Sequence, residues 1–248
     1  MLKKIIKQIA VIGAGHLGHQ LANFLVSKGY SVIASNRTKN KEDKNYKGIL
    51  FSLENIEKSD EFFFDIDLFI INIPPSQTTT NQLFEFRNKF PNRRFIYISS
   101  TSVFENNQGI VNEETIPIQK SARSKNVYEQ ESIFRKDCII RCSGLISSTR
   151  HPIHSLIKKV NNSGNHPLNL IHIDDVVEII FKTISNQIFS TLIHATHLNN
   201  YTKQEYYSQL AKKSELGEIC FNLDSSEGKK VESLTLKKWN YQFKNDLF

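Results

Sequence analysis

Three glycines near the start of the chain have the spacing G-x-G-x-x-G. They are Gly13, Gly15 and Gly18, and they directly follow an apolar run at residues 9–12. In this pattern the first glycine permits a tight turn, the second lets the backbone approach a pyrophosphate, and the third lets a helix pack closely on a strand. The start of that helix offers unpaired N–H groups and a partial positive charge to phosphates. The loop therefore predicts a dinucleotide site. Two further loop residues complete the predicted contacts, His16 and Leu17.

The residues that end the second expected strand bear on which dinucleotide binds. NAD sites usually place Asp or Glu there to bond the ribose 2′-hydroxyl, whereas this chain has Asn36 followed by Arg37. Without a carboxylate a 2′-phosphate is not repelled, and Arg37 can pair with it through two hydrogen bonds. Thr38 can add a hydroxyl, and basic residues recur as far as Lys47. We expect NADP as the cofactor, with NAD as the alternative if Arg37 only points to solvent.

The fourth expected strand ends in Ile73, and Pro74 and Pro75 then turn the chain away. Ligands of doubly wound sheets bind outside the carboxyl ends of the strands. We therefore expect the residues from Asn72 to Ser76, Ile73 and Pro74 among them, to border the cofactor.

A second set of motifs begins with an apolar strand that ends in Ser99 and Ser100. Three more follow in order: an acidic E-x-x-P stretch at 112–117, an R-x-x-G-hydrophobic segment at 141–145 and an H-x-x-D segment at 172–175. Together they resemble the extended short-chain dehydrogenase/reductase family, the NAD-dependent epimerase/dehydratase group. The chain is most similar to its small atypical YeeZ-like members, which also carry G-x-G-x-x-G. A 6-phosphogluconate or F420-type dehydrogenase is an alternative, and the strand end at Ser99 and Ser100 and the H-x-x-D segment at 172–175 argue against it.

The resemblance implies an oxidoreductase or epimerase. Hydride would move between the nicotinamide and a small, sugar-like substrate with a hydroxyl or carbonyl group. By position in the motifs, Ser100 would bond the substrate oxygen, Lys125 would hold the nicotinamide ribose, and Ser99 would border the cofactor. The positions that the resemblance assigns to the substrate are Thr101, Arg150, His151 and His172.

One catalytic residue of the family is missing. The family has a tyrosine four residues before the lysine, whose charge lowers the tyrosine pKa so that the phenol can exchange a proton. This chain has Ser121 four residues before Lys125, and a serine hydroxyl is a far poorer acid. The alternative proton donors are Tyr128, His151 and His154. The change also favours a second function, a non-catalytic dinucleotide-binding sensor or regulatory protein, in which Lys125 is a surface lysine.

Hydrophobic runs alternate with amphipathic stretches along the chain, which is typical of a parallel sheet covered by helices. Strands are expected at residues 8–12, 31–34, 48–51, 68–73, 95–98, 138–141 and 191–195. Helices are expected at residues 16–28, 79–89, 122–135, 152–160, 174–185 and 203–213. The prediction is an α/β fold with a doubly wound parallel sheet of about seven strands, the Rossmann fold. Residues 1–198 would bind NAD(P), with 144–167 on the substrate side, and 199–248 would form a small C-terminal substrate lobe.

Composition narrows the class of partner. The 248 residues carry a formal charge of +7, but the lysines are scattered and no aromatic platform accompanies them, so we expect no nucleic-acid partner. No run of eighteen apolar residues exists, so we expect no membrane span. Cys138, Cys142 and Cys220 have no metal-type spacing, so we expect reduced thiols, no metal and a cytoplasmic protein.

The substrate is an unknown small molecule, and the resemblance implies a possible homodimer through helices 79–89 and 122–135.

Overall fold

The chain forms two compact units that interleave along the sequence. The structure is a computed structural model, and it describes residues 5–37, 45–75, 79–157, 160–223 and 225–248. Unit 1 comprises Met1–Ser99, Asn126–Ile140 and Val177–Leu192, and unit 2 comprises Ser100–Lys125, Arg141–Val176 and Ile193–Phe248. Two segments before residue 198 thus belong to unit 2. The functional division at that residue stays a prediction.

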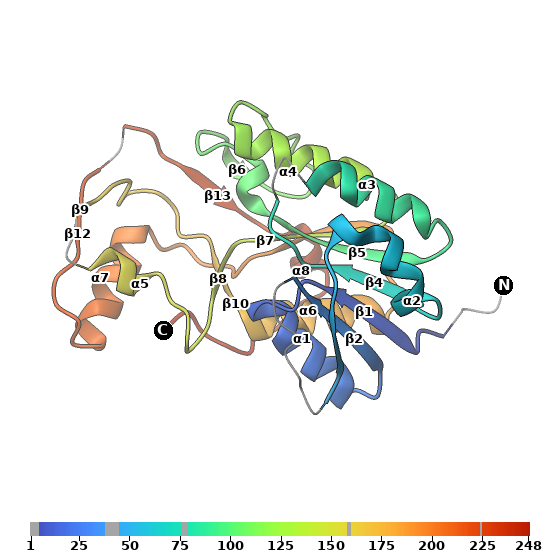
Figure 1. Ribbon diagram of the computed structural model, residues 1–248. Helices are drawn as coiled ribbons and strands as arrows, with labels where there is room; N and C mark the ends of the chain where they lie inside the picture. Colours follow the sequence, from blue (N-terminus) through green and yellow to red (C-terminus); the bar gives the residue numbers. More distant parts are fainter. Residues whose placement is uncertain (1–4, 38–44, 76–78, 158–159, 224) are drawn as a thin grey trace. The chain divides into compact units, whose positions relative to one another are not determined.

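Seven strands form one sheet in the order β11-β7-β5-β4-β1-β2-β3 (Figure 1). Their bounds are β1 Gln8–Ile12, β2 Ser31–Asn36, β3 Lys47–Leu50, β4 Leu68–Ile71, β5 Arg94–Ser100, β7 Cys138–Cys142 and β11 Thr191–Ala195. In the centre of the sheet the pairing is parallel, and Ile12 lies opposite both Ser35 and Ile71. The carboxyl ends of β1, β2 and β4 therefore meet at one edge. The predicted doubly wound sheet is confirmed.

Phenylalanines dominate the core on one face of the sheet in unit 1. The ring of Phe69 lies 5.0 Å from that of Phe95 and 5.6 Å from that of Phe63. Tyr97 stacks on Phe134 at 4.7 Å, and its hydroxyl donates to Gln130. Burying each such ring stabilises the fold by about 2 kcal/mol. The helices on this face are α3, Thr80–Lys89, and the later turns of α4, Ala122–Ile133.

Two helices cover the other face of the sheet. Helix α1, His16–Ser27, buries Leu21 and Leu25. Its Phe24 ring lies 5.6 Å from Phe181 in the later turns of α6, Ile173–Ser185. Between β3 and β4 the chain forms a 3₁₀ helix, Leu53–Lys58, and the short helix α2, Ser59–Phe63. The helices that follow β1 and β4 thus lie on opposite faces, as in a doubly wound sheet.

Unit 2 is built from short elements. Its strands pair in parallel, β6 (Gly109–Val111) with β13 (Lys229–Val231), β8 (Gly144–Ile146) with β10 (Leu170–His172), and β9 (Val160–Asn161) with β12 (Cys220–Phe221). Its helices are α5 (Ile153–Leu156), α7 (Lys203–Lys213) and α8 (Leu234–Lys238), and a 3₁₀ turn spans Thr101–Val103. A separate apolar cluster that includes Ile146, Leu170 and Tyr206 packs in this unit.

The prediction of a helix at residues 152–160 was wrong beyond the first turn of that helix. Helix α5 stops at Leu156, and the chain enters β9 at Val160. The amide of Asn161 donates to the carbonyls of Leu156 and Cys220, which holds the chain in the strand. Ser163 then takes a positive φ of 63°, which ends any helical path.

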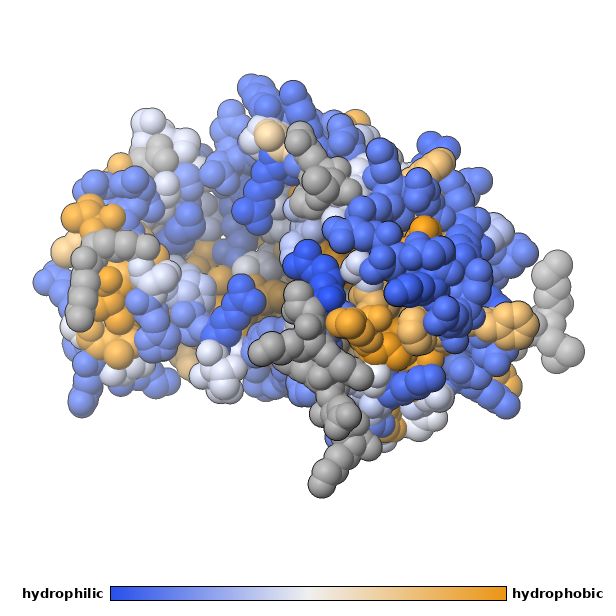
Figure 2. All heavy atoms as spheres, in the orientation of Figure 1, coloured by the Kyte–Doolittle hydropathy of each residue, from blue (hydrophilic) through white to orange (hydrophobic). Residues whose placement is uncertain are grey.

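Among the residues that the structure describes, the surface and the cysteines show no membrane-spanning helix, metal cluster or disulfide. The face in Figure 2 is mostly hydrophilic, with apolar side chains in a few small groups. Within the described ranges no helix is long and apolar enough to cross a membrane, and no three His, Cys, Asp or Glu residues are grouped to hold a metal. The cysteines are free thiols, and burial raises the pKa of Cys138 and Cys142 to about 12.

Candidate functional site

The glycine loop joins β1 to α1, and two of its glycines are required by close contacts. Gly13 has a φ of +101°, and a Cβ there would lie 2.2 Å from the main-chain oxygen of Asn72. A Cβ on Gly18 would lie 2.2 Å from the main-chain oxygen of Gly13. No real side chain tolerates such distances, so both positions need glycine for the turn and for helix packing.

The third glycine faces open space. A Cβ on Gly15 would meet nothing within 4 Å. Gly15 is the N-cap of α1, no side chain caps the helix, and its first turn holds no acidic residue. The amides of this turn can therefore receive an anion, and the open space in front of Gly15 suits a pyrophosphate. His16 is exposed, whereas Leu17 is buried, so Leu17 could contact a cofactor only through its main chain.

Neighbouring strands hold the loop in place. The amides of Gly13 and Ala14 donate to the main-chain oxygen of Ser35, at 3.3 and 2.7 Å. The side-chain amide of Asn72 donates to the main-chain oxygen of Gly13 at 2.8 Å, and the Asn72 main-chain amide donates to Ile12. Asn72, expected from the sequence to border the cofactor, thus holds the glycine loop through a hydrogen bond that the sequence did not predict.

The end of β2 carries an amide where an NAD site usually has a carboxylate. Asn36 is the last residue of β2, and its side-chain nitrogen is buried with no hydrogen-bond partner among the described residues. A buried donor without a partner costs about 1–3 kcal/mol, so the position is suited to an acceptor such as a ribose or phosphate oxygen. Arg37 follows and is exposed. Thr38 lies outside the described residues.

The end of β4 also meets the loop. Ile73 is half-buried, and its Cγ2 would lie 3.1 Å from a Cβ on Gly13. Pro74 is exposed. Ile73 therefore borders the glycine loop, whereas the contacts of Ile73 and Pro74 with a cofactor stay predictions. Ser76, also expected there, lies outside the described residues.

The two serines that end β5 have different partners. Ser99 is buried, and its hydroxyl donates to Glu131 at 2.6 Å. Only its main chain is thus left for a cofactor. The hydroxyl oxygen of Ser100 accepts from the Ser102 amide at 3.1 Å and keeps its own O–H as a donor. Thr101, expected at the substrate, is buried at the start of the 3₁₀ turn.

Ser121 is bound to a carboxylate that the sequence did not single out. Its hydroxyl donates to Glu105 at 2.9 Å, and the Ser124 hydroxyl donates to the same oxygen at 2.5 Å. The main-chain amides of Lys120 and Ser121 donate there as well. These bonds, first that from the Ser121 amide and then that from Ser124, lower the pKa of Glu105 to about 2. The contact thus supplies partners at the start of α4, and the catalytic role of Ser121 stays a prediction.

Lys125 and Tyr128 are both exposed on α4. Within the described ranges the Lys125 ammonium makes no hydrogen bond or ion pair, so it is available to a ligand. The role of Lys125 at a nicotinamide ribose stays a prediction, and so does that of Tyr128 as a proton donor.

The residues expected at the substrate have local partners in unit 2. Arg150 closes a turn with Ser147 through two main-chain bonds. His151 accepts from the Ile153 amide and bonds the Tyr206 hydroxyl at 3.0 Å. Burial, and then the charge of His154, lower the pKa of His151. These contacts hold His151 in the packing of unit 2, so its substrate role stays a prediction.

His172 has a comparable local role at the start of α6. Its Nδ1 accepts from the Asp174 amide at 3.3 Å, which supplies a partner to an N–H group at the start of the helix.

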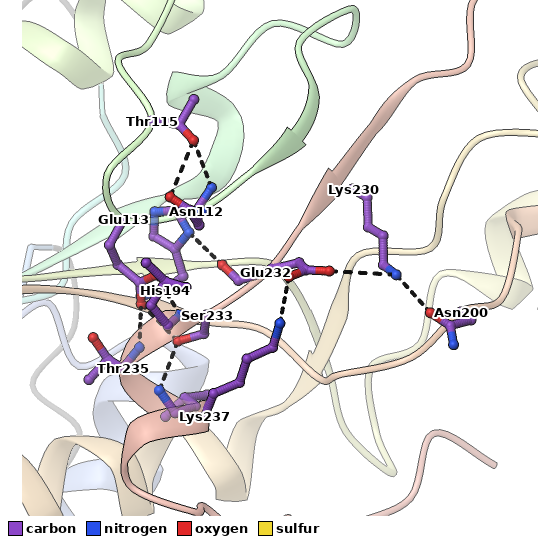
Figure 3. Close-up of polar contacts among 12 residues, drawn as sticks. Asn112, Glu113, Thr115, His194, Asn200, Lys230, Glu232, Ser233, Thr235 and Lys237 are labelled. Carbon is purple, nitrogen blue, oxygen red and sulfur yellow. Dashed lines mark hydrogen bonds and ion pairs between the residues drawn. The ribbon is translucent and has the colours of Figure 1, made fainter.

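A second carboxylate, that of the half-buried Glu113, organises unit 2 (Figure 3). It accepts from the His194 amide at 3.0 Å, from the Ser233 hydroxyl at 2.8 Å and from the first amides of α8. Burial opposes its ionisation, but the hydrogen bonds and His194 outweigh burial and lower the pKa of Glu113. The side chain of His194 in turn bonds the main-chain oxygen of Glu232. Burial lowers the pKa of His194 to about 4.

Comparison with known proteins agrees with this geometry. Residues 8–116 match the family model described as the NAD binding domain of 6-phosphogluconate dehydrogenase. That match ends before most of unit 2. Over 253 aligned residues the chain is 27% identical to protein YeeZ of Escherichia coli K12, and the match covers 91% of each chain.

Solved structures of epimerases and dehydratases share the fold. The dTDP-glucose 4,6-dehydratase of Bacillus anthracis, in complex with NAD, has a TM-score of 0.80 and 16% identity, with 96% of this chain and 92% of that chain covered. The UDP-glucuronic acid 4-epimerase of Bacillus cereus, also with NAD, has a TM-score of 0.77 and 18% identity, with 97% and 94% covered. The chain therefore has a Rossmann fold like that of the NAD-dependent epimerase/dehydratase structures, residues 8–116 match an NAD binding domain model, and the chain is similar to YeeZ over nearly its whole length.

Proposed function

We propose that the protein is an NADP-dependent oxidoreductase or epimerase that acts on a small, sugar-like substrate with a hydroxyl or carbonyl group. The observation that carries the cofactor choice is the buried side-chain nitrogen of Asn36 at the end of β2, which has no hydrogen-bond partner within the part of the chain that the structure describes. An N–H donor at this place can donate to a phosphate oxygen, and the neighbouring Arg37 adds a charge that a 2′-phosphate would pair with. The substrate class is supported by the fold shared with enzymes of UDP- and dTDP-sugars.

The residues of this chain have separate tasks in such a reaction. The glycine loop and α1 bind the pyrophosphate, and Lys125 binds the nicotinamide ribose. Bound NADPH supplies the hydride. Ser100 donates its free O–H to the substrate oxygen, which orients the carbon that reacts. Ser121 holds the start of α4, and its hydroxyl is a far poorer acid than the phenol of the family's tyrosine. The proton must therefore come from another group.

Binding of the two cofactors tests the proposal. NADPH should bind more tightly than NADH when each is titrated and followed by fluorescence. Arg37→Ala should weaken NADPH about 10- to 100-fold, since a charge-assisted contact of about 1.5–3 kcal/mol is lost, and should change NADH less than twofold. Lys28→Ala is the matched control, because Lys28 lies at the end of α1 that is remote from the glycine loop. Equal binding of both cofactors would refute the NADP preference, and binding of neither would refute the cofactor site.

The hydroxyl of Ser121, which stands where the family has its catalytic tyrosine, is hydrogen-bonded to Glu105. This favours a second candidate function, a dinucleotide-binding sensor or regulatory protein without turnover. A panel of sugar nucleotides and carbonyl compounds separates the two functions. An enzyme turns over some member of the panel with NADPH, and Ser100→Ala then lowers kcat while NADPH affinity stays within twofold. A sensor binds NADPH and shows no turnover with any member. We expect the protein to be cytoplasmic in either case.

A further inference from the structure

A cavity of about 780 Å³ lies beside α7 in unit 2. It is lined by the loop that follows β11, residues 197–201, by one face of α7 and by residues 246–248. All of these residues belong to unit 2. The volume is within the range of small-molecule sites, about 300–1,000 Å³. None of the described residues predicted to bind the cofactor or the substrate lines this cavity, so it is a place for another ligand.

Three polar side chains of different character line the cavity from α7. Glu205, Gln209 and Lys213 are spaced by four residues, so they share one face of the helix, and the first and last lie about 12 Å apart along its axis. The Oε2 of Glu205 accepts from the amide and the hydroxyl of Thr202 at 2.8 and 2.9 Å, which leaves its Oε1 for a ligand. Among the described residues, the side chains of Gln209 and Lys213 make no hydrogen bond or ion pair.

Residues 246–248 add a second carboxylate near the first turn of α7. The hydroxyl of Tyr206, in that turn, donates to the main-chain oxygen of Leu247 at 2.5 Å and holds the segment there. Asp246 is exposed, and its carboxylate makes no hydrogen bond or ion pair with any residue that the structure describes. The rings of Tyr201 and Phe248 lie 5.4 Å apart and are 37% and 40% exposed. Negative charge and aromatic surface thus gather at one end of the cavity.

The loop that follows β11 is fixed by its own side chains. Asn199 donates to the main-chain oxygen of Leu168 at 3.3 Å and accepts from the Tyr201 amide at 3.1 Å. Asn200 accepts from the Lys230 ammonium at 2.7 Å (Figure 3). Little ordering of this wall is therefore left for a ligand to impose.

His197 lines the cavity without adding charge at neutral pH. Burial lowers the pKa of its imidazole, and the opposing effects of Asp175 and Asp246 do not outweigh burial. The charged side chains of the cavity are therefore Glu205 and Asp246 near the first turn of α7 and Lys213 at its last residue. A ligand that matches them carries a cation at one end and an anion at the other.

We propose that this cavity binds an elongated zwitterion, with its ammonium group at Glu205 and Asp246 and its carboxylate at Lys213. The two carboxylates accept from the ammonium, and the half-exposed aromatic rings beside them attract a cation. The Lys213 ammonium donates to the carboxylate of the ligand, and the Gln209 amide can bond a polar group between the two ends. The site needs no dinucleotide, so it goes beyond the proposed function and does not rest on it.

Triglycine is the probe for this site. Three extended residues span about 10 Å, which is close to the spacing of Glu205 and Lys213. Triglycine is titrated into the ¹⁵N-labelled whole chain at constant ionic strength, set with sodium chloride, and binding is followed by NMR shifts of the amides. N-acetyl-triglycine lacks the ammonium and triglycine amide lacks the carboxylate. Each derivative should bind about fivefold more weakly than triglycine, as expected for the loss of one partly exposed ion pair.

Variants assign each end of the probe to its partner. Lys213→Gln should weaken triglycine about fivefold and leave triglycine amide within twofold. Lys212→Gln, the adjacent exposed lysine outside the cavity, is the matched control and should change neither. The double variant Glu205→Gln/Asp246→Asn, in which Gln still serves the capping box, should weaken triglycine about fivefold and leave N-acetyl-triglycine within twofold.

Three results would overturn the proposal: no binding of triglycine, binding of either derivative as tight as that of triglycine, or equal effects of Lys212→Gln and Lys213→Gln. The NADPH affinity of Lys213→Gln should equal that of the wild type. Loss of cofactor binding and loss of zwitterion binding are therefore separate results.

Discussion

Asn36 shows how one side chain can select between two cofactors. A carboxylate at the end of β2 would accept a hydrogen bond from a ribose hydroxyl and repel a phosphate, whereas the Asn36 amide can donate to a phosphate oxygen. The two side chains have nearly the same shape, so exchanging one for the other changes charge and donor capacity alone.

Asn36→Asp should therefore reverse the preference for NADPH. A buried negative charge beside the 2′-phosphate should weaken NADPH by about 100-fold, that is by about 3 kcal/mol, and strengthen NADH. Parallel fluorescence titrations of the two cofactors measure the ratio. Asn45→Asp, an exposed asparagine after the second strand, is the control. A variant that keeps the wild-type ratio would show that Asn36 does not contact the 2′ position.

At the scale of elements, Asn72 couples the end of β4 to the glycine loop. Asn72→Ala removes the bond to the Gly13 oxygen and should weaken NADPH and NADH alike by about fivefold, since a neutral hydrogen bond contributes about 1 kcal/mol. This differs from Arg37→Ala, which should affect only NADPH. Titration of both cofactors against Asn72→Ala checks this prediction, with Asn88→Ala on the exposed side of α3 as the control. An effect confined to one cofactor would contradict the positioning role.

The long elements could be predicted from the sequence, because their apolar residues recur with the period of a helix or form buried runs. Strands of two or three residues in unit 2, such as β9 and β12, leave no period to detect. Glu105 and Glu113 were missed for another reason. Their partners lie far along the chain, as with Glu113 and Ser233, 120 residues apart. No local pattern records which distant amides a carboxylate will cap.

The cluster of Glu113 and His194 links β11 to α8 and should make stability depend on pH. In the unfolded chain His194 takes up a proton near pH 6.5, and in the folded chain only near pH 4. Between these values the unfolded state binds the extra proton, so the free energy of unfolding falls as pH falls, by at most about 1.4 kcal/mol per pH unit. Glu113, whose pKa is also lowered, extends the loss to lower pH.

Urea unfolding at pH 7 and pH 5 measures this dependence. His194→Gln keeps a side-chain donor and removes the titrating group, so the difference in unfolding free energy between the two pH values should shrink. His154→Gln, an exposed histidine, should leave the difference unchanged. The same loss on acidification in both variants would show that His194 does not carry the effect.

At the scale of the whole molecule, the proposed homodimer would use α3 and α4. Phe84 on α3 and Tyr128 on α4 are 56% and 37% exposed, and large exposed apolar side chains on neighbouring helices are suited to an interface. Light scattering after size exclusion should give about twice the 28.6 kDa of one chain, because C2 dimers are the commonest oligomers. Phe84→Glu places charges at the interface of both copies and should give the monomer mass, whereas Phe64→Glu, 78% exposed and outside both helices, should leave the dimer intact. A monomeric wild type, or dissociation by both substitutions, would rule out this interface.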